Sequence, residues 1–190
     1  GGQTFRNYQS GNAYGSLSNN RVEAVLEDSQ QRLWIATADG LNRFIPSIDG
    51  FSVHRYSASD PKSLADSNTI SLFQDSGGLL WVGTKPAGVS KWNPRSWSFG
   101  HILPSLVAGN EELIRRATSF AEARDGELWF GSFGAGLAKV DSLGTVTDRV
   151  WSGGPDGSRI DDDRVMALIR QGDLLWIGTM SGGLSRFNLD

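Results

Sequence analysis

Short apolar segments alternate with turn-forming residues along the whole chain, and they follow a repeat. A pentapeptide of the form Leu-Trp-apolar-small-Thr/Ser occurs four times. Spacings of 47, 48 and 47 residues separate its tryptophans, which are Trp34, Trp81, Trp129 and Trp176. A Gly-apolar-x-basic segment follows each copy. Self-similarity at a fixed period indicates a repeat fold in which each unit is one supersecondary structure.

Each unit predicts four short antiparallel strands, which in the first unit lie at residues 22–27, 33–37, 41–44 and 52–56. Gly- and Asp-rich turn sequences separate the strands. A period in the forties, with four strands and one tryptophan per unit, is typical of a β-propeller blade. Because both faces of a blade pack on neighbouring blades, the strands are apolar on both sides. We expect the four tryptophans to pack between blades.

The repeat divides this single propeller region into units at residues 16–62, 63–110, 111–157 and 158–190. The last unit has three strands, and a lone strand at 4–8 has the phase of the missing fourth. The sequence therefore predicts an all-β propeller of four blades. It is either a closed ring, in which strand 4–8 completes the last blade, or an arc of a larger propeller. In the irregular third unit we expect a helical turn at 111–115 and a strand at 117–122.

Composition narrows the class of protein. Hydrophobic residues make up 38% and charged residues 21%, which is typical of a globular domain. The net charge of -3 has no basic cluster, which argues against nucleic-acid binding and against membrane contact by this segment. The absence of cysteine excludes disulfides and thiolate chemistry. The chain begins with Gly1 rather than Met, so we interpret it as a piece of a longer protein or a processed chain.

The repeats at 20–44, 68–92 and 163–187 resemble those of the two-component regulator propeller family. They share its Asn-x-Val…Glu-Asp, Leu-Trp-Ile-Gly-Thr and Gly-Gly-Leu-Ser-Arg-Phe pattern, and the link at 56–64 is similar to the family's connection between blades. The resemblance implies a periplasmic or otherwise extracytoplasmic sensor region of a bacterial signal-transduction receptor. It also implies a histidine kinase or diguanylate cyclase output domain attached in the parent protein.

Propellers bind ligands at the funnel mouth, where the loops between second and third strands meet the openings of the first strands. These loops differ between units while the frame repeats, as expected where scaffold and specificity are separate. Arginines at the strand openings favour an anionic ligand such as an acidic saccharide. The candidate ligand-binding residues are Arg21, Asp39, Asn68, Lys85, Arg116, Phe133, Arg164 and Met180.

No catalytic motif stands out. The sequence lacks a Gly-x-Ser-x-Gly elbow, a Walker loop and a His-Glu-x-x-His motif. The acidic run at 161–163 lacks the alternating ligand spacing of a calcium loop. Both histidines, His54 and His101, fall in the last strands of their units, away from the pore. We therefore predict no enzymatic activity, no metal site and no cofactor.

The leading interpretation is a non-catalytic ligand-sensing module whose ligand is a small molecule. One alternative is a propeller scaffold for protein–protein interaction. The other is a metal-dependent propeller lyase, which requires a His/Glu cluster at the pore. A homodimer is one way in which an arc covers its open blade edges.

Overall fold

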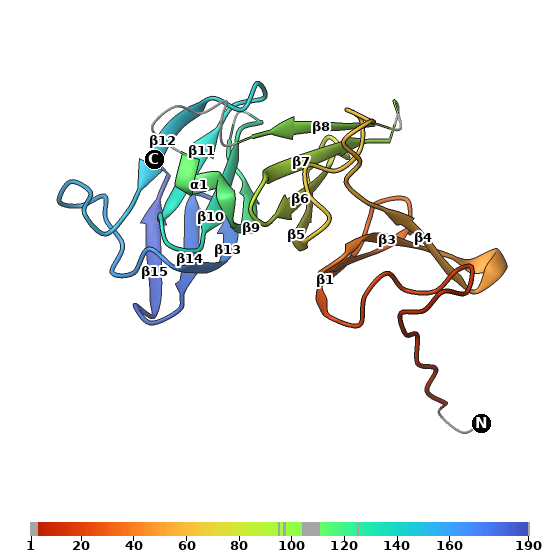
Figure 1. Cartoon of the computed structure of the whole chain (residues 1–190). Coiled ribbons are helices and arrows are strands. Elements are labelled where there is room, and N and C mark those ends of the chain that lie inside the picture. Colours follow the sequence, from red (N-terminus) through yellow and green to blue (C-terminus); the bar gives the residue numbers. More distant parts are fainter. Residues whose placement is uncertain (1–3, 95, 97, 104–110, 125, 190) are drawn as a thin grey trace.

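The computed structural model describes residues 4–94, 96, 98–103, 111–124 and 126–189. Its sheets follow one another along the chain (Figure 1). The first comprises β1 (Val22–Glu27), β2 (Leu33–Thr37), β3 (Gly40–Ile45) and β4 (Gly50–His54), with a short 3-10 helix at Pro46–Ile48. The second comprises β5 (Thr69–Gln74), β6 (Leu80–Thr84), β7 (Gly88–Asn93) and β8 (Ser98–Ile102).

Helix α1 (Glu111–Arg115) precedes the third sheet. That sheet comprises β9 (Ala117–Glu122), β10 (Leu128–Ser132), β11 (Leu137–Val140) and β12 (Val146–Val150). The last sheet comprises β13 (Val165–Gln171), β14 (Leu174–Thr179) and β15 (Leu184–Asn188). The predicted helical turn and the strand that follows it are both present in the third unit.

The sheets are blades of a propeller. Within each sheet the strands are antiparallel and pair in chain order. The first strands of neighbouring sheets contact one another, β1 with β5, β5 with β9 and β9 with β13. These four strands therefore line a common axis, and the later strands of each blade lie progressively farther out. The all-β propeller prediction is confirmed.

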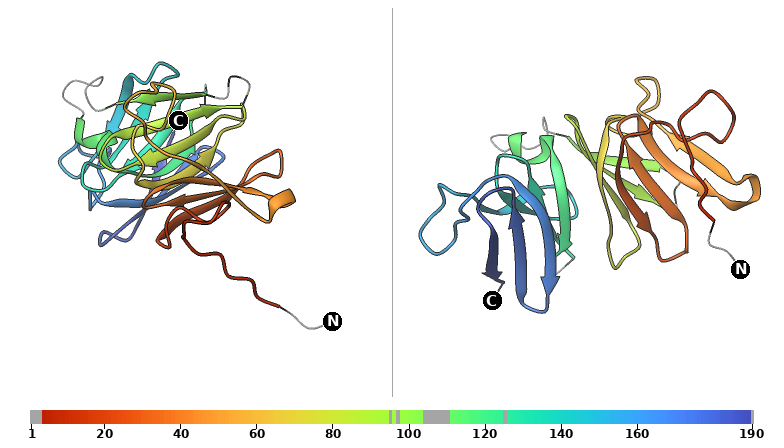
Figure 2. Two further views of the ribbon diagram at one scale, coloured as in Figure 1. Left: turned by 45° about the vertical axis from the view of Figure 1, so that its right-hand side comes forward. Right: turned by 90° about the horizontal axis from the view of Figure 1, so that it is seen from below.

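The described blades form an arc, not a closed ring (Figure 2). Residues 4–9 form no strand, so the strand predicted at 4–8 does not complete the last sheet. Tyr8 instead packs its ring 5.9 Å from Phe44 and 5.3 Å from Phe51. Leu17 joins the same apolar cluster. The N-terminal segment therefore contacts the first blade through the ring of Tyr8 and the buried side chain of Leu17.

Three of the four recurrent tryptophans pack between blades, as predicted. Trp34 lies 5.1 Å from Trp92 of the second blade, measured between ring centroids. Trp81 packs with the third blade, and Trp129 packs with the fourth. These three are 0%, 5% and 2% exposed. Trp176 is only partly buried, because no described blade covers the outer face of the last sheet.

An acidic residue after the innermost strand anchors the indole in the first two blades. Trp34 Nε1 donates to Asp28 Oδ2 at 2.8 Å, and Trp81 Nε1 donates to Asp75 Oδ2 at 2.7 Å. Burial by itself raises the pKa of Asp28, but the bonds from Trp34 and from the Arg32 backbone outweigh it and lower that pKa. These aspartates are the Asp of the repeat's Glu-Asp pair, which in the second blade is Gln74-Asp75.

The third blade lacks this anchor. Ala123 occupies the position of Asp75, and within the described part of the chain the buried Nε1 of Trp129 has no hydrogen-bond partner. The turn itself is unchanged, since the Ala123 N–H donates to the Glu127 carbonyl at 2.8 Å, as the Asp75 N–H does to Leu79 at 3.1 Å. A carboxylate at position 123 would therefore reach the indole.

Small residues near the end of each second strand let neighbouring blades approach. A Cβ on Gly83 would lie 2.2 Å from the Ala117 carbonyl oxygen of the third blade. A Cβ on Gly131 would lie 2.4 Å from a methyl of Val165 in the fourth blade. On Gly178, in the last blade, the nearest atom would be 3.6 Å away. Glycine is therefore needed at positions 83 and 131, where another blade follows closely, while in the first blade Ala36 occupies this position.

We predict opposite effects for two substitutions at the indole anchor. Asp75→Ala removes the acceptor of a buried indole and lowers the free energy of unfolding by about 1–3 kcal/mol. Ala123→Asp supplies the missing acceptor and raises it by about 1 kcal/mol. Urea unfolding followed by tryptophan fluorescence measures both. A lower stability of Ala123→Asp would contradict the assigned role of this position.

We also predict that Gly83→Ala destabilises the fold by about 1–3 kcal/mol, because the added methyl overlaps the next blade. Gly178→Ala is the matched control, and we expect its unfolding midpoint to stay within about 0.5 kcal/mol of the parent chain. Thermal and urea unfolding provide the comparison. Equal losses at both glycines would show that blade-to-blade approach is not the reason for glycine at this position.

Candidate functional site

Four equivalent backbone hydrogen bonds define one end of the propeller axis. The amides that follow each second strand donate to the carbonyls that precede each first strand, at 2.9–3.1 Å. The donor–acceptor pairs are Ala38 with Arg21, Lys85 with Asn68, Phe133 with Arg116 and Met180 with Arg164. Because the same bond recurs in every blade, these residues occupy equivalent positions around the mouth.

A β-bulge follows at the start of every innermost strand. In three blades the pairing register shifts within the first strand, between residues 22 and 24, 69 and 71, and 165 and 167. In the third blade the shift lies opposite residues 131 and 132 of the second strand. A bulge leaves one residue unpaired and re-aims its side chain. The bulged residues in chain order are Glu23, Ile70, Thr118 and Met166.

These positions enclose a cavity of about 370 Å³ at the mouth. Its lining residues are Arg21, Glu23, Asn68, Ile70, Lys85, Arg116, Thr118, Phe133 and Met166. Five of the eight candidate ligand-binding residues therefore lie together, contributed by the first three units of the chain. We call this cavity the mouth cavity.

The mouth cavity carries an excess of positive charge. Arg21 pairs with Glu23 at 2.5 Å. The guanidinium of Arg116 stacks over the Phe133 ring, 4.2 Å from its centroid. Among the described residues, neither Arg116 nor Lys85 has a carboxylate within ion-pair distance. Two cations are thus available to an anion, and the stacked ring fixes the orientation of one of them.

Three candidate residues lie outside the mouth cavity. Asp39 is one residue past the equivalent position, which Ala38 occupies, and its carboxylate pairs with Arg55 at 3.1 Å. Arg164 is held by Asp162 at 2.9 Å and also donates to Ser181. The Arg164 guanidinium lowers the pKa of Asp162 well below its ordinary range. Met180 is exposed and does not line the cavity.

The bulged residues were not among the sequence-based candidates, although the sequence carries a signal for them. Each lies two residues after a strand-opening residue, as Glu23 does after Arg21 and Thr118 after Arg116. Residues two apart in a strand face the same side. Extending each candidate by two residues would therefore have found Glu23, Ile70, Thr118 and Met166.

The histidines lie in the outer strands. His54 is packed between Trp34 and Phe99, with ring centroids 5.9 Å away in both cases. Burial, assisted by the charge of Arg43, lowers the pKa of His54. Among the described residues, no three His, Asp or Glu side chains gather as a possible metal site. The described helices include none long and apolar enough to cross a bilayer.

Comparison with known sequences identifies the repeat. The two-component regulator propeller model matches residues 16–39 and 63–85, which contain the first two copies of the motif. No curated protein was found that matches the chain.

Several solved structures share the fold. The extracellular domain of BT4673 from B. thetaiotaomicron, described as a hybrid two-component system, has a TM-score of 0.71 at 18% identity over 91% of this chain. This chain spans only 22% of that domain. The computationally designed Ika4 protein has a TM-score of 0.61 at 16% identity, over 95% of this chain and 100% of that one.

A gluconolactonase from Xanthomonas campestris, XC5397, also shares the fold, with a TM-score of 0.61 at 16% identity over 89% of this chain and 59% of that one. At such identities the structural likeness establishes the fold alone. The match at 16–39 and 63–85 is independent of that likeness. The chain is therefore a β-propeller arc that carries repeats of the two-component regulator propeller family.

Proposed function

We propose that this propeller arc is a non-catalytic ligand-binding module in the extracytoplasmic part of a bacterial signal-transduction protein. The family repeats at 16–39 and 63–85 support this role, and so does the fold shared with extracellular domains described as parts of two-component systems. In such a protein the module would act on an attached histidine kinase or diguanylate cyclase. A ligand would act by favouring one arrangement of the propeller over another.

The mouth cavity is the observation that carries the proposal. Its walls come from equivalent positions in all four blades, while the side chains at those positions differ from blade to blade. The hydrogen bonds and bulges that shape it recur in each blade. A repeated frame with a varied lining is the arrangement expected of a binding site that is built on a rigid scaffold.

The lining favours an acidic saccharide. Arg116 and Lys85 offer charge-assisted hydrogen bonds to a carboxylate. Asn68 and Thr118 add polar groups, and Phe133 adds an aromatic ring beside them. A volume of about 370 Å³ lies within the range of small-molecule sites. The proposal assigns no reaction to this site, because the likeness to a gluconolactonase extends to the fold alone.

Calorimetric titration with D-galacturonate, and with D-galactose as its neutral analogue, tests this proposal. We expect galacturonate to bind and galactose to bind at least about tenfold more weakly, because a charged hydrogen bond contributes about 1.5–3 kcal/mol. Arg116→Gln and Lys85→Gln should each weaken galacturonate binding by about tenfold or more.

Arg159→Gln is the matched control, because Arg159 is an exposed arginine paired with Asp156, outside the mouth cavity. Its affinity for galacturonate should equal that of the parent chain. Absence of binding, or equal affinities for the two sugars, would contradict the proposed ligand class. Capture of a protein partner together with the absence of sugar binding would favour the scaffold alternative.

A further inference from the structure

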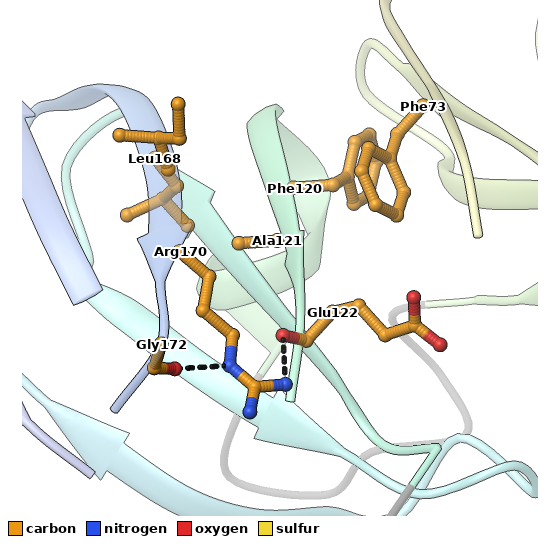
Figure 3. A pocket seen from close by; sticks show the side chains of 8 residues that line it. Phe73, Phe120, Ala121, Glu122, Leu168, Arg170 and Gly172 are labelled. Atoms are coloured by element: carbon orange, nitrogen blue, oxygen red, sulfur yellow. Dashed lines mark hydrogen bonds between the residues drawn. The ribbon is translucent and has the colours of Figure 1, made fainter. Parts of the chain in front are cut away.

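A second cavity lies at the opposite end of the innermost strands. Its volume is about 530 Å³, and it shares no lining residue with the mouth cavity. Its lining residues are Phe73, Phe120, Ala121, Glu122, Leu168, Ile169, Arg170 and Gly172 (Figure 3). They come from the last residues of β5, β9 and β13 and from the turn after β13. We call it the lower cavity.

One small residue opens the lower cavity. The position that pairs with the recurrent tryptophan is occupied by Leu26, Phe73, Ala121 and Ile169 in the four blades. Phe73 fills the gap to the next blade by stacking on Phe120, with centroids 6.3 Å apart and planes at 27°. Ala121 has only a methyl group at the corresponding position between the third and fourth blades, and it lines the lower cavity. The sequence departs from its own repeat there.

The walls of the lower cavity are mainly apolar. The stacked rings of Phe73 and Phe120 lie on one side of Ala121, and Leu168 lies on the other (Figure 3). Ile169 borders the cavity with 66% of its surface exposed. Apolar walls with few polar groups are typical of small-molecule sites, and the volume falls in their usual range.

Arg170 gives the lower cavity a fixed positive charge. Its Nε donates to the Gly172 carbonyl at 2.8 Å, and its Nη1 donates to the Glu122 carbonyl at 3.4 Å. Both acceptors are neutral, and within the described ranges no carboxylate lies at ion-pair distance from this guanidinium. The Glu122 carboxylate points away from Arg170 (Figure 3) and accepts a bond from the Ser76 amide at 3.1 Å.

The positive charge is also particular to the fourth blade. Arg170 pairs with Leu175, the leucine just before the recurrent tryptophan. In the other blades the residue that pairs with this leucine is Glu27, Gln74 or Glu122. Only the blade next to the Ala121 gap supplies a cation there. The gap and the charge therefore coincide.

We propose that the lower cavity is a second binding site, which takes a small carboxylate with an aromatic or branched apolar body. The carboxylate accepts hydrogen bonds from Arg170, whose remaining N–H groups have no hydrogen-bond partner among the described residues and can meet it in a fork. The apolar body lies over Ala121, between Phe120 and Leu168. This site does not depend on the ligand proposed for the mouth cavity.

The test uses phenylacetate as the probe and phenylacetamide as its neutral analogue, with affinities taken from ligand-observed NMR titrations. We expect phenylacetate to bind at least about tenfold more tightly than the amide. Arg170→Gln should remove this preference. Ala121→Leu should abolish binding by filling the gap, while its unfolding temperature stays at or above that of the parent chain.

Arg159→Gln again serves as the charge control and should bind phenylacetate normally. Arg116→Gln should also leave phenylacetate binding unchanged, which separates this proposal from that for the mouth cavity. Absence of phenylacetate binding would overturn the proposal, as would equal affinities for the amide. Unchanged binding in Arg170→Gln would overturn it as well, and that result does not depend on how Ala121→Leu folds.

Discussion

The whole structure depends on one constraint, which is that each sheet has two apolar faces and can bury both only between neighbouring sheets. Trp34, Trp81 and Trp129 meet this constraint by packing against the following blade. Stacking of this kind brings the first strands side by side along an axis. At the two ends of the arc, where no described blade covers the sheet, apolar side chains are exposed: Val25 is 61% exposed and Leu184 is 69% exposed. Burial therefore comes from the neighbouring blade and not from the sheet itself.

Close packing between blades explains why the residues that differ from blade to blade lie near the axis. Positions between blades admit few residues, because Gly83 and Gly131 leave no room even for a methyl group. Side chains that line the mouth cavity differ from blade to blade, although Thr118 donates a hydrogen bond to the Val165 carbonyl of the next blade at 2.6 Å. The bulges at the start of the innermost strands turn one further side chain per blade toward the mouth cavity. The frame thus fixes where a site lies, and the lining alone determines what it binds.

The repeat made most of the fold predictable from sequence, because a strand order and a packing role recur with each tryptophan. It also placed Arg21, Asn68, Lys85, Arg116 and Phe133 at one mouth. Other placements depend on details that periodicity does not carry. Asp39 was assigned one residue out of register, and Arg164 is held by Asp162, an ion pair that depends on the local turn. The segment at 4–8 was given a strand by its phase, but it forms none, and the Tyr8 ring contacts Phe44 and Phe51 of the first blade instead.

The third and fourth blades pack at different distances from each other at the two cavities. At the mouth, the third and fourth blades are in contact through Gly131 and Val165, because a Cβ added to Gly131 would lie only 2.4 Å from a methyl carbon of Val165. At the other end of the same strands, Ala121 leaves a cavity of about 530 Å³. At that end the two blades are still joined, since Arg170 Nη1 donates to the Glu122 carbonyl at 3.4 Å. The contact between the third and fourth blades is therefore tighter at the mouth than at the lower cavity, so the room for a ligand between them depends on the side chain at position 121.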